Sequence, residues 1–114
     1  MASVESKGAR WITEPSWTND YCADTCKTWE KNVLRYERES KGFKGKVDIH
    51  VGDVRHLDIG ALAPVDGLMF GFPCNDFSNV GERKGLEGNF GPLYAHGVEV
   101  LRKSIQPAWF IAEN

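Results

Sequence analysis

The chain has 114 residues and a formal net charge of −2, from 14 Lys and Arg against 16 Asp and Glu. This length suits one small domain with a modest core, and without a basic surplus the composition argues against a free-standing nucleic-acid binder. No apolar run approaches the roughly 20 residues of a membrane-spanning helix, and the first ten residues, MASVESKGAR, contain no apolar signal region. We therefore expect a cytoplasmic protein with no membrane partner.

The first half of the chain predicts a strand, a helix and a second strand. The segment from Trp11 to Thr18 leads to an acid, and no Gly or Pro interrupts residues 20–38. Apolar side chains recur there every three or four residues, at Cys22, Cys26, Trp29, Val33 and Tyr36. This spacing indicates an amphipathic helix, which Asn19 or Asp20 would cap. After the glycines of SKGFKGK, the alternating VDIHV (47–51) predicts a short strand that ends at Gly52-Asp53.

The second half predicts a strand, a loop, a helix and a last strand. VDGLMFGF (65–72) is a nearly continuous apolar run that ends at Pro73, and it suits a central parallel strand covered on both faces. Residues 81–91 hold four glycines and predict a mobile loop. Helical spacing returns in PLYAHGVEVLRKSI, where Pro92 suits the first turn. The apolar stretch 108–112, AWFIA, predicts the last strand.

Several residue types that often carry chemistry have structural explanations in this chain. Cys22 and Cys26 lie one helical turn apart without a nearby His, which is a weak metal pattern, and two small apolar side chains on a helix explain them better. With Cys74 the count is odd, which argues against a disulfide framework. The histidines have no partner spacing and predict surface positions: His50, His56 and His96. The tryptophans predict packing anchors: Trp11, Trp17, Trp29 and Trp109.

The order of elements is that of an α/β domain with a parallel sheet. In such sheets ligands gather at the carboxyl ends of the strands. Acids follow three of the four predicted strands, namely Asp20, Asp53 and Glu113, and the remaining strand ends at Pro73-Cys74. These strand ends are therefore the candidate functional site.

The stretch GFPCNDFS (71–78), followed by GERKG, GPL and Glu113-Asn114, resembles the signature motifs of the DNA cytosine-5 methyltransferases. Two weaker elements precede it in the family's order: Asn19-Asp20-Tyr21 before a helix, and Gly52-Asp53-Val54 after a strand. The resemblance spans residues from about 8 to 114. It implies that residues 1–114 form a partial methyltransferase catalytic domain, a fragment of a Rossmann-like class I S-adenosylmethionine-dependent fold with a mainly parallel sheet.

The resemblance assigns a chemical role to each signature. Cys74 would add as a thiolate to C6 of cytosine, which makes C5 nucleophilic enough to take the methyl group of S-adenosylmethionine. Glu113 would protonate or hydrogen-bond the ring nitrogen beside the addition site, with a pKa raised by burial beside an apolar strand. Ser78 would contact the DNA backbone near the extruded base. The glycine-rich loop at 81–91 would close over that base.

The resemblance also implies a set of cofactor contacts: Asp20, Tyr21, Asp53, Val54, Phe72 and Leu93. Asp20 would bond the ribose hydroxyls, although the family usually has the longer Glu there, and Tyr21 would stack near the adenine. Asp53 and Val54 would lie at the adenine edge, and Phe72 and Leu93 would form apolar walls. Structural explanations stand beside these roles: a helix cap for Asp20, a turn for Asp53, and core packing for Phe72 and Leu93.

The family's upstream strand with its Phe-x-Gly-x-Gly loop, its downstream arginine-bearing strand and its target-recognition region have no counterpart in this sequence. That first strand is central in the family's sheet, so we expect two unpaired strand edges. The chain would then rearrange its sheet, or a second polypeptide or a second copy would complete it. We expect negligible methyl transfer by the chain alone. The alternatives are a fragment of an RNA cytosine-5 methyltransferase and a non-catalytic interaction module derived from this family.

Overall fold

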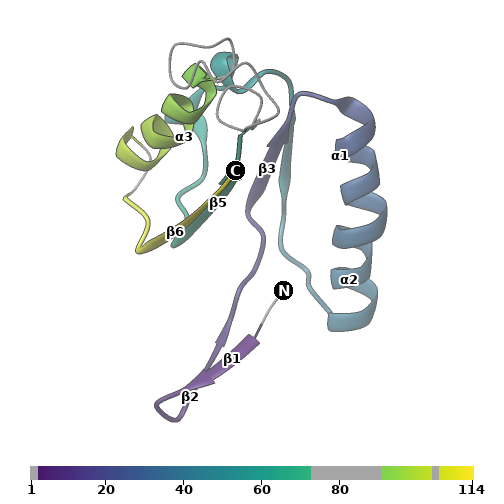
Figure 1. Cartoon of the computed structure of the whole chain (residues 1–114). Helices are drawn as coiled ribbons and strands as arrows, with labels where there is room; N and C mark the ends of the chain where they lie inside the picture. The colour runs from purple at the N-terminus through teal and green to yellow at the C-terminus, as the bar shows by residue number, and fades with distance from the viewer. Residues whose placement is uncertain (1–2, 73–90, 104–105) are drawn as a thin grey trace. The chain divides into compact units, whose positions relative to one another are not determined.

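The computed structural model describes residues 3–72, 91–103 and 106–114 (Figure 1). Cys74, Ser78 and nearly all of the predicted loop at 81–91 lie outside these ranges. The chain divides into two compact units, Met1–Asp53 and Val54–Asn114.

The first unit begins with an antiparallel hairpin of β1, Ser3–Ser6, and β2, Ala9–Ile12. Lys7 and Gly8 connect the strands with φ values of 53° and 75°, and two positive φ values in a two-residue loop match the right-handed twist of a hairpin. Trp11 lies opposite Val4 and is 64% exposed, so the prediction that it anchors a core is wrong. The predicted strand from 11 to 18 is divided, since Pro15 follows β2 and cannot donate a backbone hydrogen bond.

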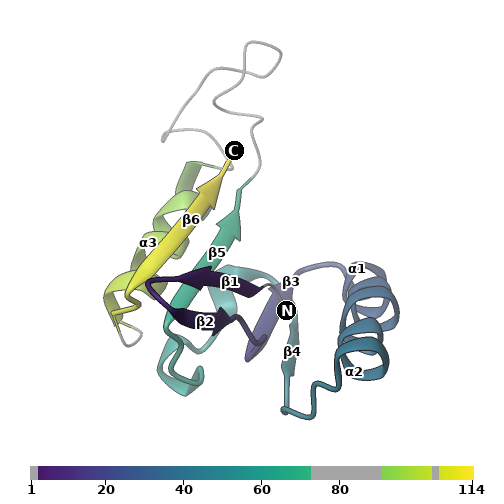
Figure 2. The ribbon, with the colours of Figure 1, turned by 90° about the horizontal axis from the view of Figure 1, so that it is seen from below.

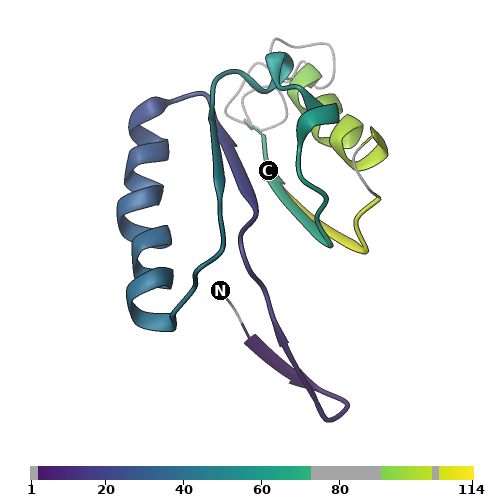
Figure 3. The same ribbon diagram turned by 180° about the vertical axis from the view of Figure 1, so that it is seen from behind.

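A parallel strand pair with a connecting helical run forms the rest of this unit. Strand β3, Trp17–Asp20, pairs in parallel with β4, Asp48–Val51, and Asp20 lies opposite Val51. The helical run between them consists of α1, Ala23–Trp29, the π-helical η1, Glu30–Leu34, and α2, Arg35–Lys41. It ends at Gly42, whose φ of 70° is a left-handed conformation that glycine adopts without strain. Figure 3 shows the run lying alongside the two strands. The predicted helix and second strand are confirmed.

The buried face of this helical run differs in part from the predicted one. Cys26 and Leu34 are buried, whereas Val33 is 42% exposed and Tyr36 also faces solvent. The wider turn of η1 delays the rotation of the following side chains, which brings Leu34 rather than Val33 to the core. Cys26 thus packs as a small apolar side chain, and Cys22 lies half-buried at the helix N-cap.

The second unit contains another parallel strand pair with a helix on one face (Figure 2). Two short 3₁₀ turns, η2 at Val54–His56 and η3 at Ile59–Ala61, precede β5, Gly67–Gly71. Helix α3, Gly91–Lys103, leads to β6, Trp109–Glu113, and Gly71 lies opposite Glu113. All three predicted elements are confirmed.

One face of this strand pair is packed and the other is open. Leu68 and Val100 are buried, and the Phe70 ring lies against Gly97 of α3. On the opposite face, Met69 is 68% exposed and Ile111 is 51% exposed. Within the second unit, the prediction that this strand is covered on both faces is therefore wrong, because α3 packs on one face and the described residues of this unit leave Met69 and Ile111 exposed on the other.

The parallel strands in the described ranges form two separate pairs, β3–β4 and β5–β6. The molecule is thus of mixed α/β class with small parallel sheets, as the order of elements predicted. Within the same ranges, no helix has the combined length and apolar character needed to span a membrane.

Candidate functional site

Asp20 and Tyr21 lie where β3 ends and the helical run begins. The Asp20 carboxylate accepts a hydrogen bond through Oδ1 from the backbone N–H of Cys22, at 2.8 Å. Asp20 therefore orders the entry to α1, although the N-cap position itself is occupied by Cys22. A carboxylate has about four acceptor sites, so this bond is compatible with a second one to a ribose hydroxyl. Tyr21 is 81% exposed, which leaves its ring accessible to a ligand.

Asn19 makes two contacts that the sequence did not predict. Its side-chain amide Nδ2 donates to the backbone carbonyls of His50, at 2.9 Å, and Gly52, at 3.0 Å. In addition, the Gly52 N–H donates to the carbonyl of Asp20 at 2.9 Å. Asn19 therefore ties β3 to the end of β4 and does not cap the helix. The one sequence feature that could have indicated this link is the amide residue Asn19 directly before the strand-terminal acid Asp20.

The turn after β4 requires a glycine. Gly52 has a φ of +147°, a conformation that side-chain-bearing residues rarely adopt. Asp53 directly follows Gly52, so the position of Asp53 depends on this turn. The Asp53 residue is half-buried. Val54, the first residue of η2 in the second unit, is also half-buried.

In the second unit, two hydrogen bonds connect β5 and β6 just past the last paired residues of the two strands. The Phe72 N–H donates to the carbonyl of Glu113 at 3.3 Å, and the Asn114 side-chain amide donates to the carbonyl of Phe72 at 3.5 Å. A Cβ placed on Gly71 would lie 3.4 Å from the Glu113 carboxylate oxygen Oε2, so the glutamate side chain lies across this glycine. The Glu-Asn pair thus ends one strand beside the strand that leads to Pro73.

The open face near this strand end has a shallow hollow of about 250 Å³, lined by Met69, Phe70, Gly71, Ile111 and Glu113. Glu113 is exposed, so the described residues do not provide the burial that the sequence predicted for it. Phe72 and Leu93 are both half-buried, which is compatible with core packing and with a pocket wall.

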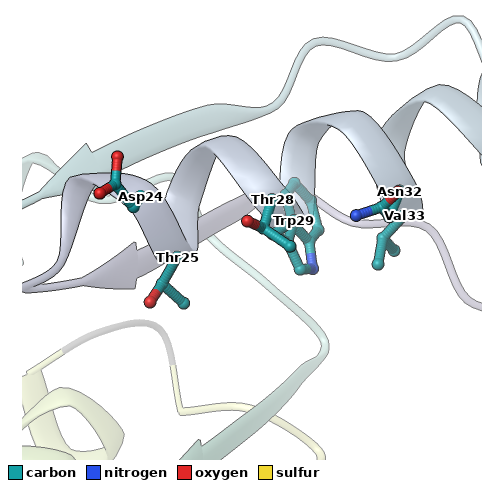
Figure 4. A pocket seen from close by; sticks show the side chains of 6 residues that line it. All are labelled: Asp24, Thr25, Thr28, Trp29, Asn32 and Val33. Carbon is teal, nitrogen blue, oxygen red and sulfur yellow. The ribbon is translucent and has the colours of Figure 1, made fainter.

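A larger hollow of about 490 Å³ lies along the helical run (Figure 4). Its lining consists of Asp24, Thr25, Thr28, Trp29, Asn32 and Val33. None of the predicted site residues belongs to this lining. The hollow is therefore separate from the strand ends that carry the motifs.

Cys22 is the thiol nearest the β3 end in the sequence. The Thr25 hydroxyl hydrogen-bonds to its sulfur and lowers the pKa of Cys22, and the backbone N–H groups of Thr25 and Asp24 add to the effect. No three His, Cys, Asp or Glu side chains in the described ranges gather in a way that could hold a metal ion.

The structure therefore brings the predicted site residues together in two groups. Asp20, Tyr21 and Asp53 lie at the carboxyl ends of β3 and β4 in the first unit, while Phe72 and Glu113 lie at those of β5 and β6 in the second. Their predicted roles stay predictions, as do those of Cys74 and Ser78.

Comparison with known proteins identifies the family. The C-5 cytosine-specific DNA methylase family matches residues 2–114. The chain belongs to this family. The resemblance seen in GFPCNDFS and the Glu-Asn pair is thereby confirmed.

Among its relatives, the chain is 44% identical to the type II methyltransferase M.BbvI of Brevibacillus brevis over 105 aligned residues, with 89% of this chain and 26% of M.BbvI covered. It is 30% identical to the type II methyltransferase M.NgoFVII of Neisseria gonorrhoeae, covering 89% of this chain and 24% of that protein. The orphan methyltransferase M.SPRI of Bacillus phage SPR is 41% identical over 58% of this chain and 15% of its own length. The chain thus spans about a quarter of the first two relatives. No solved structure matches it significantly.

Proposed function

We propose that residues 1–114 are part of the catalytic domain of a DNA cytosine-5 methyltransferase. One observation carries the proposal. Glu113 lies opposite Gly71 in the parallel β5–β6 pair, so the Glu-Asn signature ends beside the strand that continues into Pro73-Cys74. A nucleophile and an acid that act on the same cytosine ring must come from adjacent positions, and neighbouring carboxyl ends of parallel strands supply such positions.

In the proposed reaction the Cys74 thiolate adds to C6 of an extruded cytosine, and the new C–S bond places electron density at C5. The Glu113 carboxyl stabilises the developing charge by a hydrogen bond or proton to the adjacent ring nitrogen. S-adenosylmethionine would supply the electrophilic methyl group that C5 attacks, with cleavage of the bond between that methyl group and the sulfonium, which leaves as a neutral thioether. Loss of the C5 proton then returns electrons to the ring and expels Cys74 as the thiolate. Glu113 would need to be covered for this role, since burial favours the neutral form of a carboxyl group.

We assign the residues at the carboxyl ends of β3 and β4 to the adenosine part of this cofactor. The Asp20 carboxylate retains acceptor capacity for ribose hydroxyls, and the exposed Tyr21 ring offers a stacking surface for adenine. We assign Asp53 and Val54 to the adenine edge. Phe72 and Leu93 are half-buried and apolar, and we assign them to apolar contacts with the cofactor.

The finer fold assignment is part of the proposal. We propose that the two strand pairs, β3–β4 and β5–β6, belong to one Rossmann-like class I sheet that a further central strand joins. A second polypeptide, or a second copy of this chain, would supply the missing pairing and cover the face that carries Met69 and Ile111. DNA is the proposed substrate, with Ser78 against its backbone. The family match favours DNA over RNA.

A chimera tests the proposal. The segment of this chain that matches M.BbvI replaces its counterpart in that protein, and methyl transfer to DNA is measured with radiolabelled S-adenosylmethionine. We expect activity that is lost in Cys74→Ser and reduced at least a hundredfold in Glu113→Gln, because general acid catalysis contributes about 10² to 10⁴.

The matched control for the second variant is Glu30→Gln, an exposed acid on the helical run, which should leave the activity unchanged. A folded chimera without activity, or one whose activity survives Cys74→Ser, would contradict the proposal. The non-catalytic interaction module would then be favoured. The purified 114-residue chain alone should transfer no measurable methyl group.

A further inference from the structure

The end of the β3–β4 pair is held by a side chain as well as by the backbone. The two amide hydrogens of Asn19 Nδ2 satisfy two carbonyls of the neighbouring strand end, His50 at 2.9 Å and Gly52 at 3.0 Å. Both contacts join residues more than 30 positions apart in the sequence and are partly shielded from water. They therefore form a tertiary link and not a local cap.

This link acts at a point where the backbone alone is weakly constrained. Gly52 has a φ of +147° and no atom within 4 Å of its Cβ position, so side-chain packing does not hold the turn. Glycine also has the largest conformational freedom to lose on folding. The Gly52 N–H donates to the Asp20 carbonyl, and Asn19 secures the Gly52 carbonyl on the other side of the same residue. The turn is thus fixed through both polar groups of Gly52.

We propose that Asn19 is a positioning residue that holds Asp20 and Asp53 at a fixed separation for the adenosine part of the cofactor. The inference rests on the proposed function, since it assigns both acids to that part. Asn19 precedes Asp20 directly, and its bond to Gly52 fixes the residue directly before Asp53. One amide group therefore constrains the backbone next to both acids.

The chemistry at this position is specific to asparagine. An amide nitrogen offers two donors in one plane, whereas a carboxylate of the same size offers none. Asn19→Asp would thus lose both bonds and place negative charge against two carbonyl oxygens. Asn19→Ser is a milder variant, because its single short hydroxyl cannot reach both carbonyls. Asn32→Asp, on the exposed side of the helical run, is the matched control.

The first measurement is amide hydrogen exchange on the full 114-residue chain. We expect exchange at the Gly52 and Asp53 amides to be about tenfold or more faster in Asn19→Asp and Asn19→Ser, because loss of one hydrogen bond in a partly buried site corresponds to about that factor. Exchange at Cys26, in the helical core, should stay unchanged, and Asn32→Asp should match the unmodified chain. Unchanged exchange at Gly52 in both variants would overturn the proposal.

The second measurement separates positioning from a purely structural role. In the M.BbvI chimera, Asn19→Ser should raise the KM for S-adenosylmethionine about tenfold and change kcat less than twofold, because the link lies at the adenosine side and not at the transferred methyl group. Equal KM values with and without the substitution would overturn the positioning role. A chimera that is inactive even with Asn19 in place would contradict the proposed function instead, and the exchange measurement would then decide whether Asn19 holds the turn.

Discussion

The contact between α3 and β5 leads to the prediction that Gly97→Ala destabilises the second unit. A Cβ at residue 97 would lie 2.3 Å from Cε2 and 2.5 Å from Cδ2 of the Phe70 ring. Carbon atoms in favourable contact are about 3.5 to 4.0 Å apart, so the ring or the helix would have to shift by more than 1 Å. The neighbouring atoms belong to a ring packed between a strand and a helix, which limits how far it can turn.

Two effects of opposite sign determine the magnitude. Overpacking of this kind costs about 1 to 3 kcal/mol, whereas replacing a helical glycine with alanine stabilises by about 1 kcal/mol. The net change should be a loss of up to about 2 kcal/mol in the free energy of unfolding. In a Phe70→Leu background the ring atoms Cε2 and Cζ are absent, which removes the shortest contact, and the smaller side chain can turn away from the helix. There, Gly97→Ala should be neutral or stabilising by up to about 1 kcal/mol.

Urea unfolding followed by circular dichroism, for the four proteins of this double-mutant cycle, measures the coupling between the two positions. We expect a coupling energy of about 1 to 3 kcal/mol. Hydrogen exchange at Phe72, whose N–H donates to the Glu113 carbonyl, reports on the same strand end without assuming two-state unfolding. An identical effect of Gly97→Ala in both backgrounds would refute the packing argument.

Two further predictions concern the first unit. Gly52→Ala should lower the free energy of unfolding by about 1 to 3 kcal/mol. The loss should come from backbone strain alone, since nothing lies within 4 Å of the Cβ position of residue 52. Urea unfolding midpoints should show no such loss for the control Gly60→Ala, whose Cβ would make an ordinary 3.4 Å contact. Thr25→Val should raise the pKa of Cys22 towards its ordinary value, because it removes the hydroxyl bond that favours the thiolate. The rate of Cys22 alkylation at pH 7, measured by peptide mass spectrometry, should therefore be lower in Thr25→Val than in the unmodified chain. The two rates should become equal at a pH above the ordinary thiol pKa. Equal rates at pH 7 would argue against this role of Thr25.

The sequence predicted the regular elements because their signals are local. The spacing of apolar residues over 20–38 located the helical run, and the apolar stretch before Pro73 located β5. The π-helical turn at Glu30–Leu34 was missed, since Val33 and Leu34 are both apolar and the sequence alone does not show which of them faces the core. The hairpin before Ile12 was also missed, although Lys7-Gly8 is a turn that favours one.

What the sequence could not predict depends on contacts between distant segments. The exposure of Met69 depends on whether a second helix covers the sheet, and local pattern does not report that. The role of Asn19 emerges only when β4 lies beside β3, which brings His50 and Gly52 within reach of its amide. For the same reason the motifs located Glu113 at a strand end without revealing that it is exposed in this chain.

The most direct test of the proposed chemistry is covalent trapping on Cys74. The M.BbvI chimera is incubated with S-adenosylmethionine and DNA that carries 5-fluorocytosine at the target position. Because the C5 fluorine cannot leave as a proton does, the sulfur adduct at C6 should persist. The account predicts one DNA adduct on the peptide containing Cys74 by mass spectrometry, and none with Cys74→Ser. An adduct on Cys22 or Cys26, or methyl transfer that proceeds without an adduct on Cys74, would contradict it.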